Sequence, residues 1–139
     1  MILALDVGSR RIGLAISDPG ERFAFPLRTL ERRSLHDDLE AIVAAAREYG
    51  ARTIVVGDPL ALSGARGPAA EKMDAFVAVL ARAFDGEIAR VDERLTTAQA
   101  NRTLLAADLS RKRRRASIDP LAAALILEGY LARRNRERA

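Results

Sequence analysis

The sequence predicts an α/β domain with a mixed five-stranded sheet, in which three antiparallel strands are followed by two parallel ones, flanked by about four helices. Two observations carry this prediction. Residues 1–30 contain three apolar segments separated only by short turns, as in an antiparallel meander. The chain then alternates helical patterns with short β-branched runs, which is typical of helices that connect parallel strands.

The first three strands are predicted from their apolar patterns and turns. Residues 2–7 form an almost continuous apolar run, which indicates a strand covered on both faces. Gly8-Ser9 marks a turn, and residues 12–16 return as the second strand. Residues 23–30 alternate as a third strand, where Pro26 favours an edge position.

The later elements follow from helical spacing and strand composition. Ser34 caps a helix that Gly50 ends, and Thr96 with Gln99 forms a capping box for another. The expected elements are, in order, a helix within 34–50, a strand over 53–57, a helix over 69–84, a strand over 87–92, a helix from 96 to about 107, and a last helix from 117 to about 133.

Positive charge gathers at the C-terminal end. Residues 1–95 contain 13 Lys and Arg against 15 Asp and Glu, whereas residues 96–139 contain 10 against 4. We expect one domain over residues 1–139, with a basic mobile loop at about 108–116, where like charges repel, and a frayed basic tail at 133–139. Such asymmetry predicts contact with a polyanion.

Composition excludes several kinds of chemistry. There is no cysteine, so disulfides, thiol nucleophiles and cysteine metal sites are excluded, and the single histidine, His36, is interpreted as a solvated helix residue. No apolar run reaches the roughly 20 residues of a membrane span, and no secretory signal precedes the first strand, so we expect a cytoplasmic protein. Aromatic residues make up only 4% of the chain, which argues against single-strand binding by stacking.

Three carboxylates stand at informative places. Asp6 interrupts the first apolar run, Glu93 follows the last strand, and Asp119 precedes Pro120 in the last helix. Each has an ordinary structural explanation: Asp6 can hydrogen-bond the turn, Glu93 can form a surface ion pair, and Asp119 can suit a helix start. If they converge at one sheet edge, their mutual repulsion favours a divalent cation such as Mg²⁺, which prefers oxygen ligands.

Five segments spread over nearly the whole chain form a recognisable set: LDVGSRRIGLA at 5–15, VVGDPL at 55–60, residues 64–68, DERLTT at 92–97 and IDPLAAALIL at 118–127. In these segments and in their order, the sequence resembles the YqgF family, also called RuvX, bacterial proteins of the ribonuclease H-like superfamily related to RuvC resolvases. One departure is Asp58 before Pro59, where the family usually has an apolar or small residue, which puts substrate contacts of that loop in question.

The resemblance implies a ribonuclease H-like fold and a nuclease that depends on Mg²⁺ or Mn²⁺. By motif match, Asp6, Glu93 and Asp119 would be the catalytic residues and metal ligands. Family members are generally assigned to processing the 5′ end of precursor 16S rRNA, and some to Holliday-junction cleavage. The expected phosphate contacts are Arg10, Arg11 and Arg94 near the site and the basic run Arg111, Lys112, Arg113, Arg114 and Arg115.

Other functions remain open from the sequence. A Holliday-junction resolvase would use the same chemistry on branched DNA but needs two paired active sites, hence a dimer. A non-catalytic nucleic-acid-binding or ribosome-assembly protein would function without Asp6. An actin-like ATPase or sugar kinase also begins with an Asp-x-Gly hairpin, but needs a second such domain. The expected partners are structured RNA, branched DNA or a ribosomal precursor particle, with the chain as a monomer or homodimer.

Overall fold

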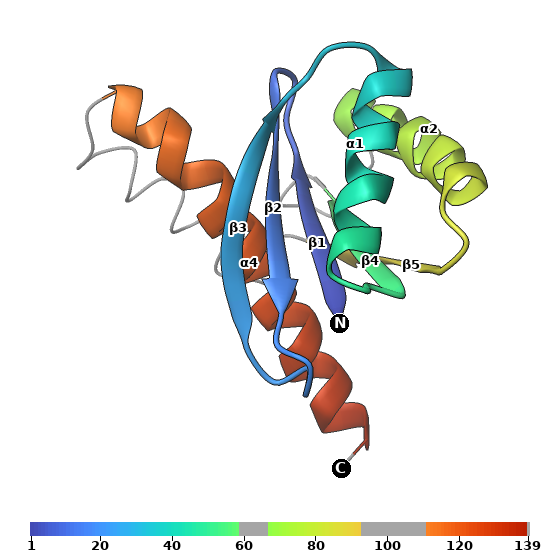
Figure 1. Cartoon of the computed structure of the whole chain (residues 1–139), viewed down its shortest axis with the longest axis vertical. Coiled ribbons are helices and arrows are strands. Elements are labelled where there is room, and N and C mark those ends of the chain that lie inside the picture. Colours follow the sequence, from blue (N-terminus) through green and yellow to red (C-terminus); the bar gives the residue numbers. More distant parts are fainter. Residues whose placement is uncertain (59–66, 93–110, 139) are drawn as a thin grey trace.

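The structure, a computed structural model, describes residues 1–58, 67–92 and 111–138, with the backbone alone over 111–119 (Figure 1). The elements are β1 (Ile2–Val7), β2 (Arg11–Ser17), β3 (Ala24–Glu31), α1 (Leu35–Glu48), β4 (Thr53–Asp58), α2 (Pro68–Ala83), β5 (Glu87–Asp92) and α4 (Arg111–Arg138). The predicted helix from 96 to about 107 lies outside the described residues.

The five strands form one mixed sheet in the order β3-β2-β1-β4-β5. β1 pairs antiparallel with β2, and β2 pairs antiparallel with β3, as expected for the meander. β4 pairs parallel with β1 on one side and with β5 on the other. The predicted arrangement of three antiparallel strands followed by two parallel ones is confirmed, with β1 at the centre.

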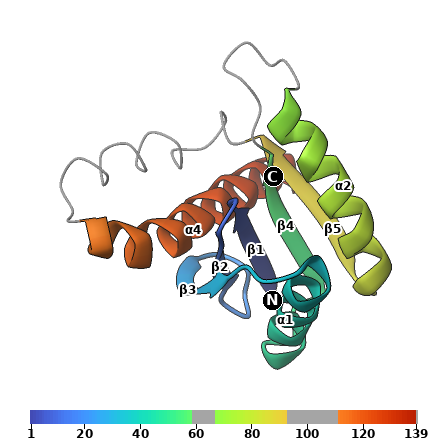
Figure 2. The ribbon, with the colours of Figure 1, turned by 90° about the horizontal axis from the view of Figure 1, so that it is seen from above.

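Both faces of the sheet are covered. Alternation along β1 sends Leu3 and Leu5 into a core beneath α1 and α2, whereas Ile2 and Ala4 join a second core beneath α4. Figure 2 shows α4 along one face and α1 with α2 along the other. This two-sided burial explains why β1 is an almost continuous apolar run.

α4 is longer at both ends than the sequence predicted. It begins at Arg111 and ends at Arg138, so residues 111–116 and 133–138, expected in a loop and a frayed tail, are helical. The physical reason is that Arg and Lys are good helix formers, and the buried segment around Ala123 and Leu127 removes the cost of helix nucleation. Residues 108–110 of the expected loop lie outside the described part.

Local signals set other boundaries as predicted. Ser34 is the N-cap of α1, its side chain accepting a hydrogen bond from the N–H of Asp37 at 3.1 Å. β4 continues one residue beyond the predicted Gly57, because Asp58 still pairs with Asp92 of β5. Within the described residues, no helix is both long and apolar enough to cross a membrane.

Candidate active site

The carboxyl ends of three parallel strands each carry a carboxylate. Asp6 is the penultimate residue of β1, while Asp58 and Asp92 are the last residues of β4 and β5. Sites in open α/β sheets form at this edge, where the strands end and the connections leave the sheet. The predicted metal ligands are therefore expected at this edge.

Asp6 lies half-buried on the α4 face of the sheet. It has the same parity along β1 as Ile2 and Ala4, which both pack in the core beneath α4. Its register partner on β2 is Gly13, which has no side chain. The neighbouring strand β2 therefore places no side chain directly opposite Asp6 on this face of the sheet.

α4 runs along β1 in the opposite direction. Near its end, Arg134 binds the side chain of Glu21 at 3.2 Å, and Glu21 also pairs with the α-amino group of Met1 at 3.3 Å. Ala123 lies about 16 Å before Arg134 along the helix, which is close to the length of β1 from Met1 to Asp6, about 17 Å. α4 crosses the sheet obliquely, and its first half lies towards the end of the molecule at which β1 ends (Figure 1). The backbone of Asp119 belongs to that first half, and its side chain is outside the described part.

Glu93 and Arg94 also lie outside the described residues. Glu93 directly follows Asp92, the end of β5. Along that strand Ala89 and Val91 pack in the core beneath α4, and position 93 has the same parity. The structure therefore describes the end of β5, the residue immediately before Glu93.

A partly buried ion-pair network, which sequence reasoning missed, occupies the other face of the same edge. Arg90 donates to Asp58 at 3.0 Å and to Asp74 of α2 at 2.6 Å. The Asp58 side chain is only 11% exposed. Through Arg90, Asp58 therefore links β4 to β5 and α2 on the face opposite Asp6. The atypical residue at the loop start has a structural role here.

A second contact that the sequence did not reveal fixes the turn after Asp6. Arg32 donates from Nη1 to the carbonyl of Gly8 at 2.9 Å and from Nε to the buried carboxylate of Asp38 at 3.1 Å. Its guanidinium also lies 5.7 Å from the ring centre of Phe76 in α2. One side chain therefore ties the β1–β2 turn to α1 and α2.

The two predicted phosphate contacts in the described part differ in availability. Arg10 is exposed and lines an open groove of about 540 Å³ at the β1–β2 turn, together with Arg32 and Arg33. Arg11 is paired with Glu31 at 2.9 Å, and that carboxylate is 68% exposed. The backbone of residues 111–115 forms the start of α4, and their side chains lie outside the described part.

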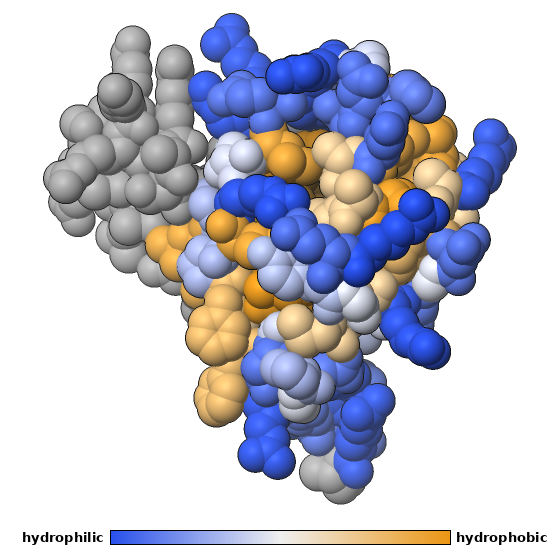
Figure 3. All heavy atoms as spheres, in the orientation of Figure 1, coloured by the Kyte–Doolittle hydropathy of each residue, from blue (hydrophilic) through white to orange (hydrophobic). Residues whose placement is uncertain are grey.

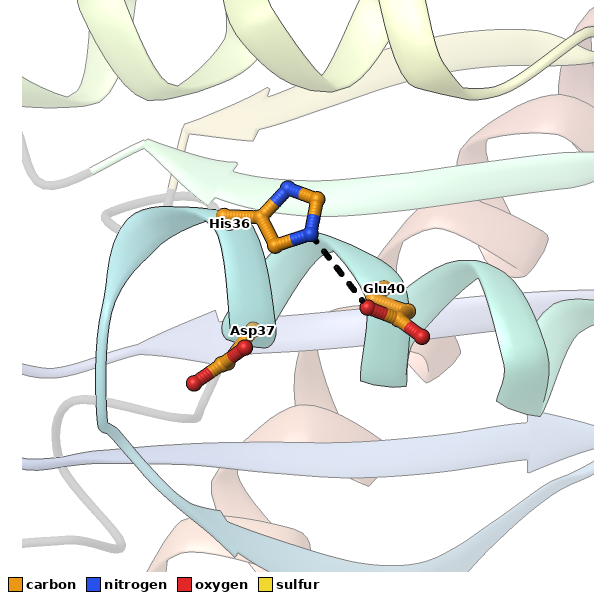
Figure 4. Close-up of side chains that lie close together, drawn as sticks. All are labelled: His36, Asp37 and Glu40. Carbon is orange, nitrogen blue, oxygen red and sulfur yellow. Dashed lines mark ion pairs between the residues drawn. The ribbon is translucent and has the colours of Figure 1, made fainter.

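Within the described residues, one group of three side chains meets a simple geometric criterion for a metal site. Figure 4 shows His36, Asp37 and Glu40 in the first turns of α1, with Nε2 of His36 3.5 Å from Glu40 Oε2. All three are exposed, and the pair is an ordinary i,i+4 contact on a helix surface. This cluster is not the predicted site. His36 is solvated, as interpreted from the sequence.

The residues at the Asp6 edge fit a hard divalent cation. Carboxylate oxygens are the ligand type that Mg²⁺ and Mn²⁺ favour. Asp6 is half-buried, and its register partner Gly13 places no side chain opposite it. The other two predicted ligands, Glu93 and Asp119, would have to come from the two flanking segments.

Comparisons with known proteins agree with this architecture. A model of the RuvX family, described as Holliday junction resolvase, matches residues 1–133. The chain is 44% identical over 132 residues to a Clostridium perfringens protein named "Putative pre-16S rRNA nuclease", covering 95% of this chain and 96% of the relative. A Moorella thermoacetica protein of the same name is 48% identical over 132 residues, covering 95% and 94%.

A solved structure shows the same fold at low identity. RuvC of T. thermophilus in complex with Holliday junction substrate superposes with a TM-score of 0.59 and 13% identity, covering 96% of this chain and 94% of that one. At this identity the likeness establishes a RuvC-like, ribonuclease H-like fold. The family match over nearly the whole chain confirms the resemblance seen in the sequence motifs. This chain belongs to the RuvX family.

Proposed function

We propose that the protein is a metal-dependent nuclease that hydrolyses phosphodiester bonds in structured nucleic acid, with the 5′ end of precursor 16S rRNA as its substrate. The observation that carries this proposal is the placement of Asp6: half-buried, at the carboxyl end of the central strand, on the face that α4 covers. The names of the relatives at 44% and 48% identity support the substrate.

Asp6, Glu93 and Asp119 are the proposed ligands. β1 and β5 are separated by one strand, so their axes are about 10 Å apart. Two side chains reaching inward across that gap, with a third from the overlying helix, suit a centre whose ions are about 4 Å apart. The side chains of Glu93 and Asp119 remain part of the proposal.

A bound Mg²⁺ or Mn²⁺ pair would polarise the scissile phosphate and lower the pKa of a water molecule. The chain's own residues orient the Asp6 carboxylate and neutralise the charge of the substrate phosphates. The Arg32 contacts hold the turn after Asp6, so the carboxylate stays in one position. Arg10, and the basic run at the start of α4, would bind the phosphates that flank the cleaved bond.

Phosphate contacts give affinity without much sequence choice. Arg10, Arg32 and Arg33 line the open groove next to the β1–β2 turn, and Asp38 already neutralises Arg32. Arg10 and Arg33 are therefore the cations of this groove that we assign to substrate phosphates. Arg94 and Arg111–Arg115 would extend the contact on the other side of the site.

A second candidate function is cleavage of Holliday junctions. It is favoured by the description of the RuvX family and by the shared fold with RuvC in complex with its junction substrate. The chemistry at Asp6 would be the same. This function further requires a homodimer that presents two sites to one junction, whereas processing of rRNA within a ribosomal precursor particle can be performed by a monomer.

The decisive experiment compares two substrates with the same set of variants. Wild type, Asp6→Asn and Glu93→Gln are each incubated with a precursor 16S 5′-end RNA and with a four-way DNA junction, in Mg²⁺, in Mn²⁺ and in chelator. We expect metal-dependent cleavage of the RNA by the wild type alone. Both variants should fold and should bind RNA, since they remove a charge without changing volume.

Each alternative gives a different pattern. Cleavage of the junction but not of the RNA would establish the resolvase. Equal cleavage by wild type and Asp6→Asn would overturn the catalytic assignment. Salt-sensitive RNA binding by all three proteins, with cleavage by none under any condition, would favour the non-catalytic ribosome-assembly role.

A further inference from the structure

Two exposed phenylalanines lie at the end of the molecule remote from Asp6. Among the described residues, the large apolar side chains with high exposure are Phe23 at 63%, Phe25 at 51% and Leu35 at 44%. The chain contains only four phenylalanines, so half of them are on the surface. Neither Phe23 nor Phe25 belongs to the two apolar cores, and exposed apolar patches of this kind mark interaction surfaces.

Phe25 lies in β3, and Phe23 directly precedes the strand. Ala24 between them packs towards the core beneath α4, so Phe23 and Phe25 have the parity of the other face. Figure 2 shows that α1 stands beside β1 and β4 rather than beneath β3. Figure 3 shows apolar side chains projecting from the flank of the molecule, beside its hydrophilic lower end.

The turn that presents Phe23 is rigidly built. Asp18 accepts hydrogen bonds from the N–H groups of Arg22 and Phe23, both at 2.7 Å, and of Gly20 at 3.1 Å. The N–H of Asp18 in turn donates to the carbonyl of Phe23 at 3.2 Å. Because the backbone is fixed in this way, the exposed ring is preorganised, and binding loses little conformational freedom.

Arginines lie at the same end of the molecule as the phenylalanines. The contact of Arg134 with Glu21 brings the end of α4 against this turn, and Arg136 and Arg138 are exposed there. Arg22, between the turn and Phe23, is also exposed. Rings and cations at one end of the molecule match the chemistry of a single nucleic-acid strand, whose bases stack and whose phosphates are anionic.

A second copy of the chain is a poorer occupant. Self-association would bring the same arginines together, and like charges across an interface are unfavourable. The edge of β3 also carries Pro26 and an irregularity in its register with β2, both of which hinder pairing with another strand. The charge and the strand edge therefore both favour nucleic acid.

We infer that Phe23 and Phe25, with the arginines at the same end of the molecule, form a stacking platform for unpaired nucleotides of the substrate strand. Phe25 pairs with Ile16, and Ile16 pairs with Leu3, so the platform is about 10 Å along and about 10 Å across the sheet from Asp6, on the opposite face. A strand that reaches both must pass around the sheet. The platform thus selects substrates with a single-stranded segment next to the cleaved bond.

This inference rests on the proposed nuclease function and differs from an expectation drawn from the sequence. The low aromatic content of the sequence argued against stacking, but the number of aromatic residues does not show where they lie. The platform would serve recognition of a single-stranded 5′ segment, since stacking accepts every base and depends on strand separation rather than on sequence.

The test measures binding of fluorescently labelled single-stranded oligonucleotides, RNA and DNA of one sequence, to Asp6→Asn protein, so that cleavage does not interfere. The platform variants are Phe23→Leu/Phe25→Leu and Phe23→Trp/Phe25→Trp. Leucine keeps an apolar side chain without an aromatic face, and tryptophan keeps the aromatic face. Thermal unfolding of each variant checks that the fold is retained.

We expect the leucine pair to weaken single-strand binding about fivefold or more, and the tryptophan pair to bind at least as well as the parent. Weaker binding of either the RNA or the DNA oligonucleotide supports the platform. The oligonucleotide whose binding weakens more shows whether the platform prefers RNA or DNA. Unchanged binding by the leucine pair would overturn it. So would a concentration-dependent dimer, seen by sedimentation in the parent and lost in the leucine pair, because the patch would then be a self-association surface.

Failure of this inference and failure of the nuclease proposal can be distinguished. With an active enzyme, the leucine pair should cleave a substrate without a single-stranded segment at the wild-type rate and lose efficiency only when that segment is present. If no protein cleaves any substrate, the binding measurement still decides whether the platform exists.

Discussion

Arg32 and Asp38 form a buried ion pair that positions the turn after the candidate catalytic aspartate. The two side chains meet at 3.1 Å, and Asp38 is only 5% exposed. Asp38 also accepts a hydrogen bond from the N–H of Arg33 at 2.9 Å, and Arg32 reaches the carbonyl of Gly8. The pair therefore joins the start of α1 to the turn that follows β1.

Arg32→Met should destabilise the protein by about 2 kcal/mol, because a buried carboxylate loses its cation. The matched control is Arg11→Met, whose partner Glu31 is 68% exposed, and the expected cost there is about 0.5 kcal/mol. Urea unfolding of both variants gives the comparison. If both variants lost the same free energy of unfolding, the burial of Asp38 would not make its ion pair with Arg32 more stabilising than the exposed pair of Arg11 with Glu31.

Arg113→Ala tests the basic run at the start of α4. If Arg113 contacts one phosphate, the slope of log binding constant against log salt concentration should become shallower by about 0.7 to 0.9. The control is Arg82→Ala at the end of α2, an exposed arginine outside the proposed contact surface. An unchanged slope for Arg113→Ala would mean that this arginine does not contact phosphate.

Much of the fold could be predicted because its signals are local. The apolar run of β1, the turn at Gly8 and the cap at Ser34 each specify an element without reference to distant residues. The length of α4 could not be predicted, because repulsion within its basic start indicates a loop unless the buried segment that anchors the helix is known.

The candidate site could be predicted only in part for a similar reason. A charge inside a buried strand marked Asp6, but its face became clear only from its alternation with Ile2 and Ala4. The network of Asp58, Arg90 and Asp74 depends on the register of β4 with β5 and on the packing of α2. Neither the strand register nor the helix packing can be predicted from the residue pattern of a single segment.

The turn that carries Phe23 should loosen in acid. Hydrogen bonds from the N–H of Phe23, and then from those of Arg22 and Gly20, hold the pKa of Asp18 below its ordinary value of 3.8. Because the folded-state pKa is lowered, the carboxylate's contribution is present above the unfolded-state pKa and is lost as the pH falls through the folded-state pKa.

NMR titration of Asp18 should therefore give a midpoint below 3.8, and exchange protection of the Phe23 and Arg22 amides should fall together with it. Asp18→Asn is the control, since its amide oxygen still accepts hydrogen bonds but does not titrate. In that variant, protection of the two amides should be insensitive to pH over the same range. Similar pH dependence in both proteins would exclude Asp18 as the cause.

Glu21 provides a last prediction, because its backbone is strained and its side chain compensates. Its φ is 56°, in the left-handed region, and its carboxylate binds both Arg134 and the α-amino group of Met1. Glu21→Ala loses both ion pairs and keeps the strain. Glu21→Gly loses the same ion pairs but relieves the strain.

Glu21→Gly should therefore be more stable than Glu21→Ala by about 1 kcal/mol, after allowance for the greater freedom of glycine in the unfolded chain. Urea unfolding measures the difference, and both variants should increase amide exchange in the last turns of α4, where Arg134 loses the carboxylate of residue 21 and keeps only its backbone carbonyl. If alanine and glycine gave the same stability, the left-handed conformation at Glu21 would carry no cost.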